Sequence, residues 1–224
     1  KEPIFPMEFL KNAELFEKIE KTSARLEMTD LLADFFKTMN PEAAPAFVYL
    51  LQGKLAPDFE SIKIGMGEKF VIETISKVTG FSREKVEKKF KETGDLGETT
   101  LELVQQKKQQ SFFSAPLTLK KLHANLLKID KTGGQGSQES KIRLLAELLN
   151  SARPLEAKFI VRVPMEELRL GVGDPTIMDS LALNLVPQFK KKHAKEMQKI
   201  EAELKTKKME ERKEELVRKT RMKI

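Results

Sequence analysis

The 224-residue chain contains no cysteine and no tryptophan, and it has only one tyrosine and two histidines. Without thiols there can be no disulfide bond and no thiolate metal ligand, and the isolated His123 and His193 cannot form a metal cluster. We therefore expect no metal site, and we interpret His123 as a surface or half-buried side chain of a helix. The sequence predicts no membrane span, because no apolar run approaches the roughly 18 residues that a span needs. It also shows no basic, apolar and small-residue succession of the kind that marks a signal peptide. We expect an intracellular protein without a membrane partner.

Basic residues exceed acidic ones, 41 against 34, but the excess is unevenly distributed. Residues 185–224 hold 14 basic and 7 acidic residues, which leaves residues 1–184 neutral. Within that body, residues 1–104 carry 15 basic and 19 acidic residues, whereas residues 105–173 carry 12 and 6. A basic stretch that is also rich in glycine turns is suited to neutralising phosphates.

The chain contains an internal duplication. Residues 18–22 recur as 128–132, and residues 64–68 recur as 170–174. Between these markers 29–36 corresponds to 142–149, Pro41 to Pro154, and 47–48 to 159–160. The offset changes from 110 to 113 and then to 106, so the loops differ in length while the helices keep their register. We predict one pseudo-two-fold body that offers two equivalent backbone surfaces to a two-fold-like ligand, with duplex nucleic acid as the obvious candidate.

Apolar residues recur with the helical period, and no segment alternates long enough to indicate a strand. The pattern predicts an all-α chain of roughly ten or more short helices. In the first copy, the expected helix boundaries are Asn40-Pro41, Gly53, Gly67, Gly80, Ser82 and Gly94. In the second copy, helices are expected near 119–131, 138–150 and 154–163, and another opens with Asp174 as cap and Pro175 in the first turn, then breaks at Val186-Pro187.

Three regions follow from this organisation. Residues 1–6 are expected to be a flexible lead, and residues 7–184 a duplicated all-helical domain with copies at about 9–80 and 119–184, joined by a connection at 105–118. Residues 185–224 form a basic, Lys/Glu-rich tail or interdomain linker. This tail can be a solvated helix with ion pairs four residues apart, or it can remain partly disordered.

Residues 131–141 combine glycines with flanking cations. Glycines such as Gly134 and Gly136 allow the backbone to approach a ligand closely, and Ser137 is placed to cap the following helix. The free N–H groups of that helix start would make a phosphate seat between Lys131 and Lys141. It is not a Walker loop, because the Gly-Lys-Ser/Thr ending is missing. The alternative is a flexible turn between two helices.

A second glycine element occurs once in each copy. Gly171 and Gly173 precede a helix and follow Arg169, whose planar cation suits a phosphate or a narrow groove. The first copy has Gly65 and Gly67 in the same register, with Lys63 as the preceding cation. A single Gly-x-Gly before a helix is usually a turn. Two such elements related by duplication favour ligand contact.

Several of these segments carry a family resemblance. Residues 134–138 with 141–146, and 168–174 with 176–179, are similar to the N-terminal DNA-binding domain of ATP-dependent DNA ligases, closest to the archaeal type, as are residues 25–32, 49–57 and 94–97. The resemblance covers about residues 7–184. It implies an all-helical, pseudo-two-fold domain that sits on the minor groove of nicked duplex DNA and supports nick sealing in replication, repair and recombination. The DNA-binding residues that we expect are Lys63, Gly65, Gly67, Lys131, Gly134, Gly136, Ser137, Lys141, Arg169, Gly171 and Gly173.

The chain also departs from this family. The catalytic lysine of the family lies in a Lys-x-Asp-Gly motif, and the nearest sequence here, at 128–131, lacks the glycine and falls in the wrong domain. We therefore expect no catalytic residue and no cofactor in this chain, with ATP and magnesium used by the full-length enzyme. Glu166 and Glu167 place two acids near the expected DNA face, where the family has a basic or apolar run.

Residues 109–113 resemble the short sliding-clamp-binding motif that archaeal ligases carry at this position. Phe112 and Phe113 would fill an apolar pocket of the partner, with Gln109 hydrogen-bonding at its rim. Alternatively, both rings pack beneath the connection as core. The alternative function for the whole chain is a non-catalytic helical adaptor that binds the clamp and not DNA, which exposure of Glu166 and Glu167 would favour. We expect a monomer associated with the nucleoid.

Overall fold

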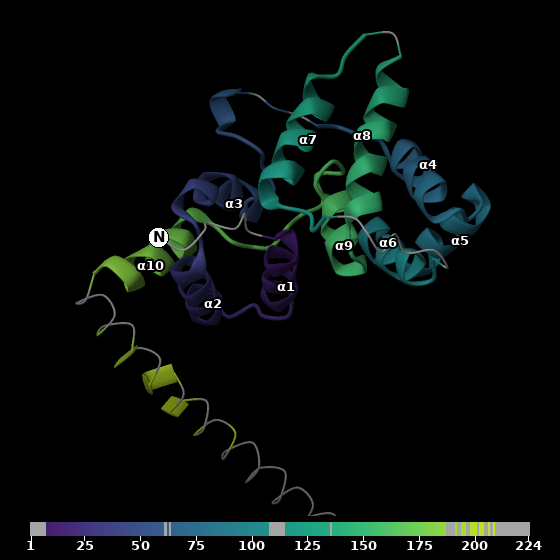
Figure 1. Ribbon diagram of the computed structural model, residues 1–224. Helices are drawn as coiled ribbons and strands as arrows, with labels where there is room; N and C mark the ends of the chain where they lie inside the picture. Colours follow the sequence, from purple (N-terminus) through teal and green to yellow (C-terminus); the bar gives the residue numbers. More distant parts are fainter. Residues whose placement is uncertain are drawn as a thin grey trace, which may run out of the picture.

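The computed structural model describes residues 8–60, 62, 64–107, 115–134 and 136–186, with isolated positions between 191 and 208. Within these residues the chain forms ten α-helices, two short 3-10 helices and no strand (Figure 1). The helices are α1 (Phe9–Glu20), α2 (Arg25–Thr38), η1 (Pro41–Ala43), α3 (Ala44–Leu51), η2 (Asp58–Glu60), α4 (Glu68–Thr79), α5 (Arg83–Thr93), α6 (Leu96–Gln105), α7 (Leu119–Lys131), α8 (Ser137–Ser151), α9 (Pro154–Arg162) and α10 (Asp174–Leu185). The all-α prediction is confirmed. The predicted lead at 1–6 lies outside the described residues.

Most helix boundaries follow the capping signals. The side chain of Asn40 accepts the N–H of Glu42 at 3.0 Å at the start of η1, and the side chain of Ser82 accepts the N–H of Lys85 at 3.4 Å at the start of α5. At the other end, α4 and α5 stop at Gly80 and Gly94, which adopt the left-handed conformation that glycine allows. These boundaries confirm the predictions for the first copy.

Two predicted caps in the second copy are wrong. Ser137 and Asp174 are the first residues of α8 and α10, while Gly136 and Gly173 hold the cap positions. Because glycine has no side-chain acceptor, neither helix start receives a capping hydrogen bond from its own cap residue. Both helix starts therefore keep backbone N–H groups without a side-chain cap. Helix α10 ends at Leu185, just before Pro187, as expected.

The helix contacts follow a pseudo-two-fold symmetry, in which a helix of one copy packs against a helix of the other copy and their counterparts make the equivalent contact. Helix α2 packs against α10, and its counterpart α8 packs against α4; in the same way α1 packs against α9, and α7 against α3. Glu8 and Thr118, which are related by the offset of 110 residues, pair with each other in an isolated antiparallel bridge. A residue that contacts its own counterpart must lie at the symmetry axis, so the axis passes between these two residues. The duplication has produced one body.

The core is continuous across both copies. Phe16 of α1 packs edge-on against Phe159 of α9, with ring centroids 5.4 Å apart, and stacks on Phe47 of α3 at 6.2 Å. Phe47 and Phe159 are counterparts in the duplication, and all three rings are fully buried. Removing so much aromatic surface from water stabilises the two copies as a unit.

Helices α5 and α6 lie between the two copies in sequence and have no counterpart in the second copy. Helix α6 lies directly against α9 (Figure 1). A Cβ atom at Gly97 would lie 2.5 Å from Nε of Arg162 and 2.8 Å from the carbonyl oxygen of Lys158. Only glycine therefore permits this approach of the two helices. No described helix is long and apolar enough to cross a membrane.

Candidate nucleic-acid interface

The two Gly-x-Gly segments have the same pattern of burial. In each one, two buried apolar residues alternate with two exposed glycines. The buried residues are Ile64 and Met66 in the first copy, and Leu170 and Val172 in the second. The apolar side chains anchor the segments in the core. The glycine backbone therefore faces outward in both copies.

Each segment ends at the start of a helix. Gly67 and Gly173 are the cap residues of α4 and α10, and neither helix start receives a side-chain hydrogen bond. Their φ angles of −66° and −93° are open to any residue, and a Cβ would meet nothing at Gly67 and only the ring of Pro175, at 3.6 Å, at Gly173. Internal packing therefore does not require glycine at either position. What these glycines do provide is open access to the positive end of a helix.

The fold brings the two segments into one surface. The N–H of Met66 donates to the carbonyl oxygen of Pro164 at 3.1 Å, in the loop that leads to the second segment. A Cβ at Gly53, whose φ is +71°, would lie 2.7 Å from the carbonyl oxygen of Leu168 in the same loop. Connections about 100 residues apart in sequence are thus in direct contact.

Arg169 places a positive charge on this surface. Its side chain is exposed and makes no ion pair with the described residues. The neighbouring Glu166 and Glu167 are also exposed. Partial burial raises the pKa of Glu167, and the nearby carboxylates of Asp95 and Glu68 raise it further. The surface therefore carries a cation and several acids. Lys63, the predicted counterpart of Arg169, lies outside the described residues.

Residues 132–134 and 136 lie at the tip of the α7–α8 hairpin, which projects beyond the neighbouring helices (Figure 1). Gly134 and Gly136 have φ angles of +83° and +81°, and a Cβ at either one would meet no other atom. Lys131 is exposed, whereas Lys141 and Ser137 are half-buried. The predicted residues of this region therefore lie at one end of the α7–α8 hairpin, in a different part of the chain from the two Gly-x-Gly segments.

Net charge distinguishes this hairpin from its counterpart. Lys120, Lys128 and Lys131 are exposed on α7, and Arg143 is exposed on α8; none makes an ion pair among the described residues. The α7–α8 hairpin, residues 119–151, carries six basic and three acidic residues, whereas the α1–α2 hairpin, residues 9–38, carries five and six. The α7–α8 hairpin is therefore the more positive of the two, in line with the uneven charge distribution of the sequence.

A buried ionic cluster beneath the surface was missed at the level of sequence. Arg162, only 7% exposed, donates from Nε and Nη2 to the two carboxylate oxygens of Asp95 at 3.2 and 2.8 Å, and also contacts Glu20. Lys158 lies 3.0 Å from Glu20 and 2.8 Å from Glu98. The cluster joins α9 to α1 and α6. The available signal was a pair of cations four residues apart in a helix whose other residues, apart from Glu156, are apolar.

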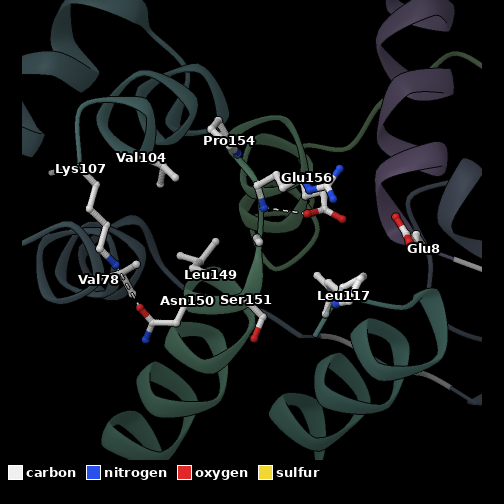
Figure 2. Close-up of a pocket in the computed structure, with 13 residues that line it drawn as sticks. Glu8, Val78, Val104, Lys107, Leu117, Leu149, Asn150, Ser151, Pro154 and Glu156 are labelled. Atoms are coloured by element: carbon white, nitrogen blue, oxygen red, sulfur yellow. Dashed lines mark hydrogen bonds between the residues drawn. The ribbon is translucent and has the colours of Figure 1, made fainter. Parts of the chain in front are cut away.

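Two hollows lie elsewhere on the body. A cavity of about 220 Å³ is drawn in Figure 2, where Glu156 accepts the N–H of Arg153 at 2.7 Å and Lys107 contacts Asn150 at the rim. Burial raises the pKa of Glu156. A larger groove of about 780 Å³ lies between α3 and α7 and contains His123, which is half-buried as expected and hydrogen-bonds to the carbonyl oxygen of Leu55. No predicted site residue lines either hollow.

Gln109, Phe112 and Phe113, the predicted clamp-binding residues, lie outside the described residues. Among the residues that are described, no group of three or more histidine, aspartate or glutamate side chains is arranged to hold a metal ion.

Comparison with known proteins places the chain in a family. The family described as the DNA ligase N terminus matches residues 8–182, and the chain belongs to it. It is 44% identical over 186 residues to a DNA ligase of Acidianus ambivalens and 42% identical over 177 residues to one of Nitrosopumilus maritimus, with 79% of this chain covered in each case. A DNA ligase of Thermococcus onnurineus is 36% identical over 176 residues. The matched region spans only 30–31% of the length of these relatives.

Proposed function

We propose that this chain is the DNA-binding part of an ATP-dependent DNA ligase and that it grips nicked duplex DNA through the minor groove and the backbone phosphates. The observation that carries this proposal is the pair of equivalent, outward-facing Gly-x-Gly segments, each opening a helix without a side-chain cap. Helix N-termini bind phosphate through free N–H groups and the helix dipole. Two of them related by a pseudo-two-fold axis suit a ligand whose two strands are themselves related by two-fold axes.

The proposed contacts divide into two groups. The first is the central surface, with Arg169, Gly171 and Gly173 from the second copy and Lys63, Gly65 and Gly67 from the first. The second is the hairpin turn, with Lys131, Gly134, Gly136, Ser137 and Lys141. Backbone amides and cations of this kind position DNA without reading its sequence. Binding is therefore expected to depend on shape and phosphate charge, in common with other minor-groove proteins.

Arg169 decides between DNA binding and the adaptor alternative. Glu166 and Glu167 are exposed, which is the feature that would favour a clamp adaptor. They precede the exposed Arg169, whose positive charge partly offsets the raised pKa of Glu167, and they adjoin two helix starts without side-chain caps. An exposed cation beside two helix starts without side-chain caps is suited to an anionic ligand, so DNA binding is the better supported function.

Within a longer ligase, this chain would position DNA, and residues outside it would carry out the chemistry. ATP and magnesium would be used by the part of the enzyme that carries the Lys-x-Asp-Gly lysine. We further propose that the chain acts as a monomer on the DNA of the nucleoid, and that the segment containing Gln109, Phe112 and Phe113 binds a sliding clamp.

The proposal is tested by titrating a fluorescently labelled duplex, nicked or intact, with the 224-residue protein at several salt concentrations. Neutralised phosphates release counterions, so affinity should fall steeply as salt rises, with similar values for unrelated sequences. The proposal would be refuted if the protein did not bind DNA at low salt, or if its affinity did not change with salt concentration.

A further inference from the structure

The loop between α9 and Arg169 follows a closely defined path. The N–H of Glu167 donates to the carbonyl oxygen of Arg162 at 2.9 Å, and the N–H of Glu166 donates to that of Val163 at 3.0 Å. The N–H of Arg169 then donates to the carbonyl oxygen of Glu167 at 2.9 Å. Glu166 has a φ of +58°, an unusual value for a residue with a side chain, so its surroundings must impose this conformation.

The same loop supports the first copy. The N–H of Met66, between the two exposed glycines of the first segment, donates to the carbonyl oxygen of Pro164. The carbonyl oxygen of Leu168 lies against Gly53, where no larger residue would fit. A change in the path of residues 163–168 would therefore displace both Gly-x-Gly segments together.

The buried ionic cluster fixes the point where this loop begins. The fork of Arg162 is held by both oxygens of Asp95, and Asp95 is itself fixed as the cap of α6 because its Oδ1 accepts the N–H of Glu98 at 2.8 Å. Glu20 of α1 contacts the same guanidinium from another helix. The last residue of α9 is thus held by side chains of two other helices.

We propose that Arg162 and Asp95 are positioning residues for DNA binding, which hold the loop of residues 163–168 so that Arg169 and both Gly-x-Gly segments face one duplex. This inference rests on the proposed function. Neither side chain needs to touch DNA, since Arg162 is 7% exposed and both carboxylate oxygens of Asp95 already accept hydrogen bonds within the protein. Their contribution is preorganisation. Without the Arg162–Asp95 pair, the loop would have to become ordered when DNA binds, and the affinity for DNA would fall.

The test uses two conservative variants of the full chain. Asp95→Asn retains an oxygen for the helix cap but removes the charge, and Arg162→Lys retains the charge but removes the planar fork. Each variant is expected to bind duplex roughly 2- to 30-fold more weakly, the range typical of residues that act through others. The slope of log affinity against log salt should stay unchanged, because the phosphate contacts in the complex are the same. In the free variants, hydrogen exchange at the amides of Met66 and Glu167 should accelerate.

Two control variants separate positioning from other effects. Arg83→Lys makes the same chemical change in an exposed pair with Glu87 on α5, and should leave affinity and exchange unchanged. Val86→Ala truncates a fully buried side chain on α5, a helix that carries no proposed DNA contact and that none of the loop's hydrogen bonds involves. It should lower the melting temperature without weakening DNA binding at a temperature where the protein stays folded.

The outcomes distinguish this inference from the proposed function. If Arg169→Ala weakens binding while Asp95→Asn and Arg162→Lys bind as the wild type does, the positioning role is wrong and the DNA-binding role stands. The positioning role would also be overturned if Val86→Ala lost as much affinity as Asp95→Asn and Arg162→Lys. A smaller salt slope in those two variants would overturn it as well. If the wild-type chain binds no DNA at all, the proposed function fails first.

Discussion

Arg162 of α9 grips the carboxylate of Asp95 at the start of α6 through two parallel hydrogen bonds, although the two residues are 67 positions apart. The geometry is that of a planar fork on a planar acceptor, which a lysine cannot reproduce. The pair joins α6, one of the two helices without a counterpart in the second copy, to α9, which leads into the candidate DNA surface.

Removal of this pair should destabilise the fold. Arg162→Met leaves three acids, Glu20, Asp95 and Glu98, without their shared guanidinium. Removing one partner of a buried ion pair lowers the free energy of unfolding by about 3–5 kcal/mol. Because the acids here are partly exposed, we expect a loss of about 2–4 kcal/mol. Urea unfolding would measure it. The matched control Lys54→Met removes an exposed partner of Asp58 and should cost at most about 1 kcal/mol. Equal costs for both variants would show that the cluster contributes no more than a surface pair.

The stability contributed by Asp95 should depend on pH in a defined direction. Burial alone would raise the pKa of Asp95, but hydrogen bonds from Arg162 and from the N–H of Glu98 lower it overall. A lowered pKa gives stability that is fully present above the ordinary aspartate value of about 3.9 and is lost as pH falls through the value in the folded state. The difference in unfolding free energy between wild type and Asp95→Asn should therefore be constant at neutral pH and shrink in acid. A difference that instead grew in acid would contradict the assignment.

Substitution of the exposed cation should affect binding and leave stability unchanged. Arg169→Ala is expected to weaken duplex binding by about 1–3 kcal/mol and to reduce the salt slope by about one. Lys63→Ala should cost less, since the first copy is less basic. The melting temperature should stay close to that of the wild type. Arg83→Ala, on α5, is a control that should bind normally. A large loss of stability with unaltered affinity would show that Arg169 is structural.

The acid next to Arg169 should weaken DNA binding. Partial burial and the carboxylates of Asp95 and Glu68 raise the pKa of Glu167. Protonation of Glu167 as pH falls through that raised value should strengthen binding, and Glu167→Gln should bind about 2- to 5-fold more tightly at neutral pH with a smaller pH dependence. Glu14→Gln, an exposed change on α1, serves as the control for overall charge. Anisotropy titrations between pH 5 and 8 make the comparison, and weaker binding by Glu167→Gln would refute the repulsion.

The clamp hypothesis rests on two phenylalanines. Burial of Phe112 and Phe113 in a partner pocket is worth roughly 3–6 kcal/mol before ordering costs. Replacement of both by alanine should abolish co-elution with a sliding clamp while DNA affinity persists. Phe59→Ala removes another phenylalanine that is 85% exposed and should leave co-elution intact. If the double variant unfolds or aggregates, the two rings belong to the core and the clamp hypothesis fails.

The sequence by itself determined the helical class, the duplication and most helix boundaries. Helical periodicity and caps such as Asn40, Ser82 and Gly80 act over a few residues, so they can be seen in a local stretch of sequence. The repeat of residues 64–68 at 170–174 likewise predicted two equivalent glycine segments. The local sequence did not predict which residue caps α8 and α10. Serine and aspartate suit the cap position, but Ser137 and Asp174 lie in the first turn and the preceding glycines occupy the cap.

Only the tertiary structure decided which segments meet. The contact of Met66 with Pro164 and the grip of Arg162 on Asp95 each join residues more than 60 positions apart. A buried cation looks the same in sequence as a surface one, because its partner is chosen by helix packing and not by spacing along the chain. Gly97 illustrates the difference. In sequence it is a glycine within a helix, whereas in the folded protein any larger residue at this position would collide with Arg162.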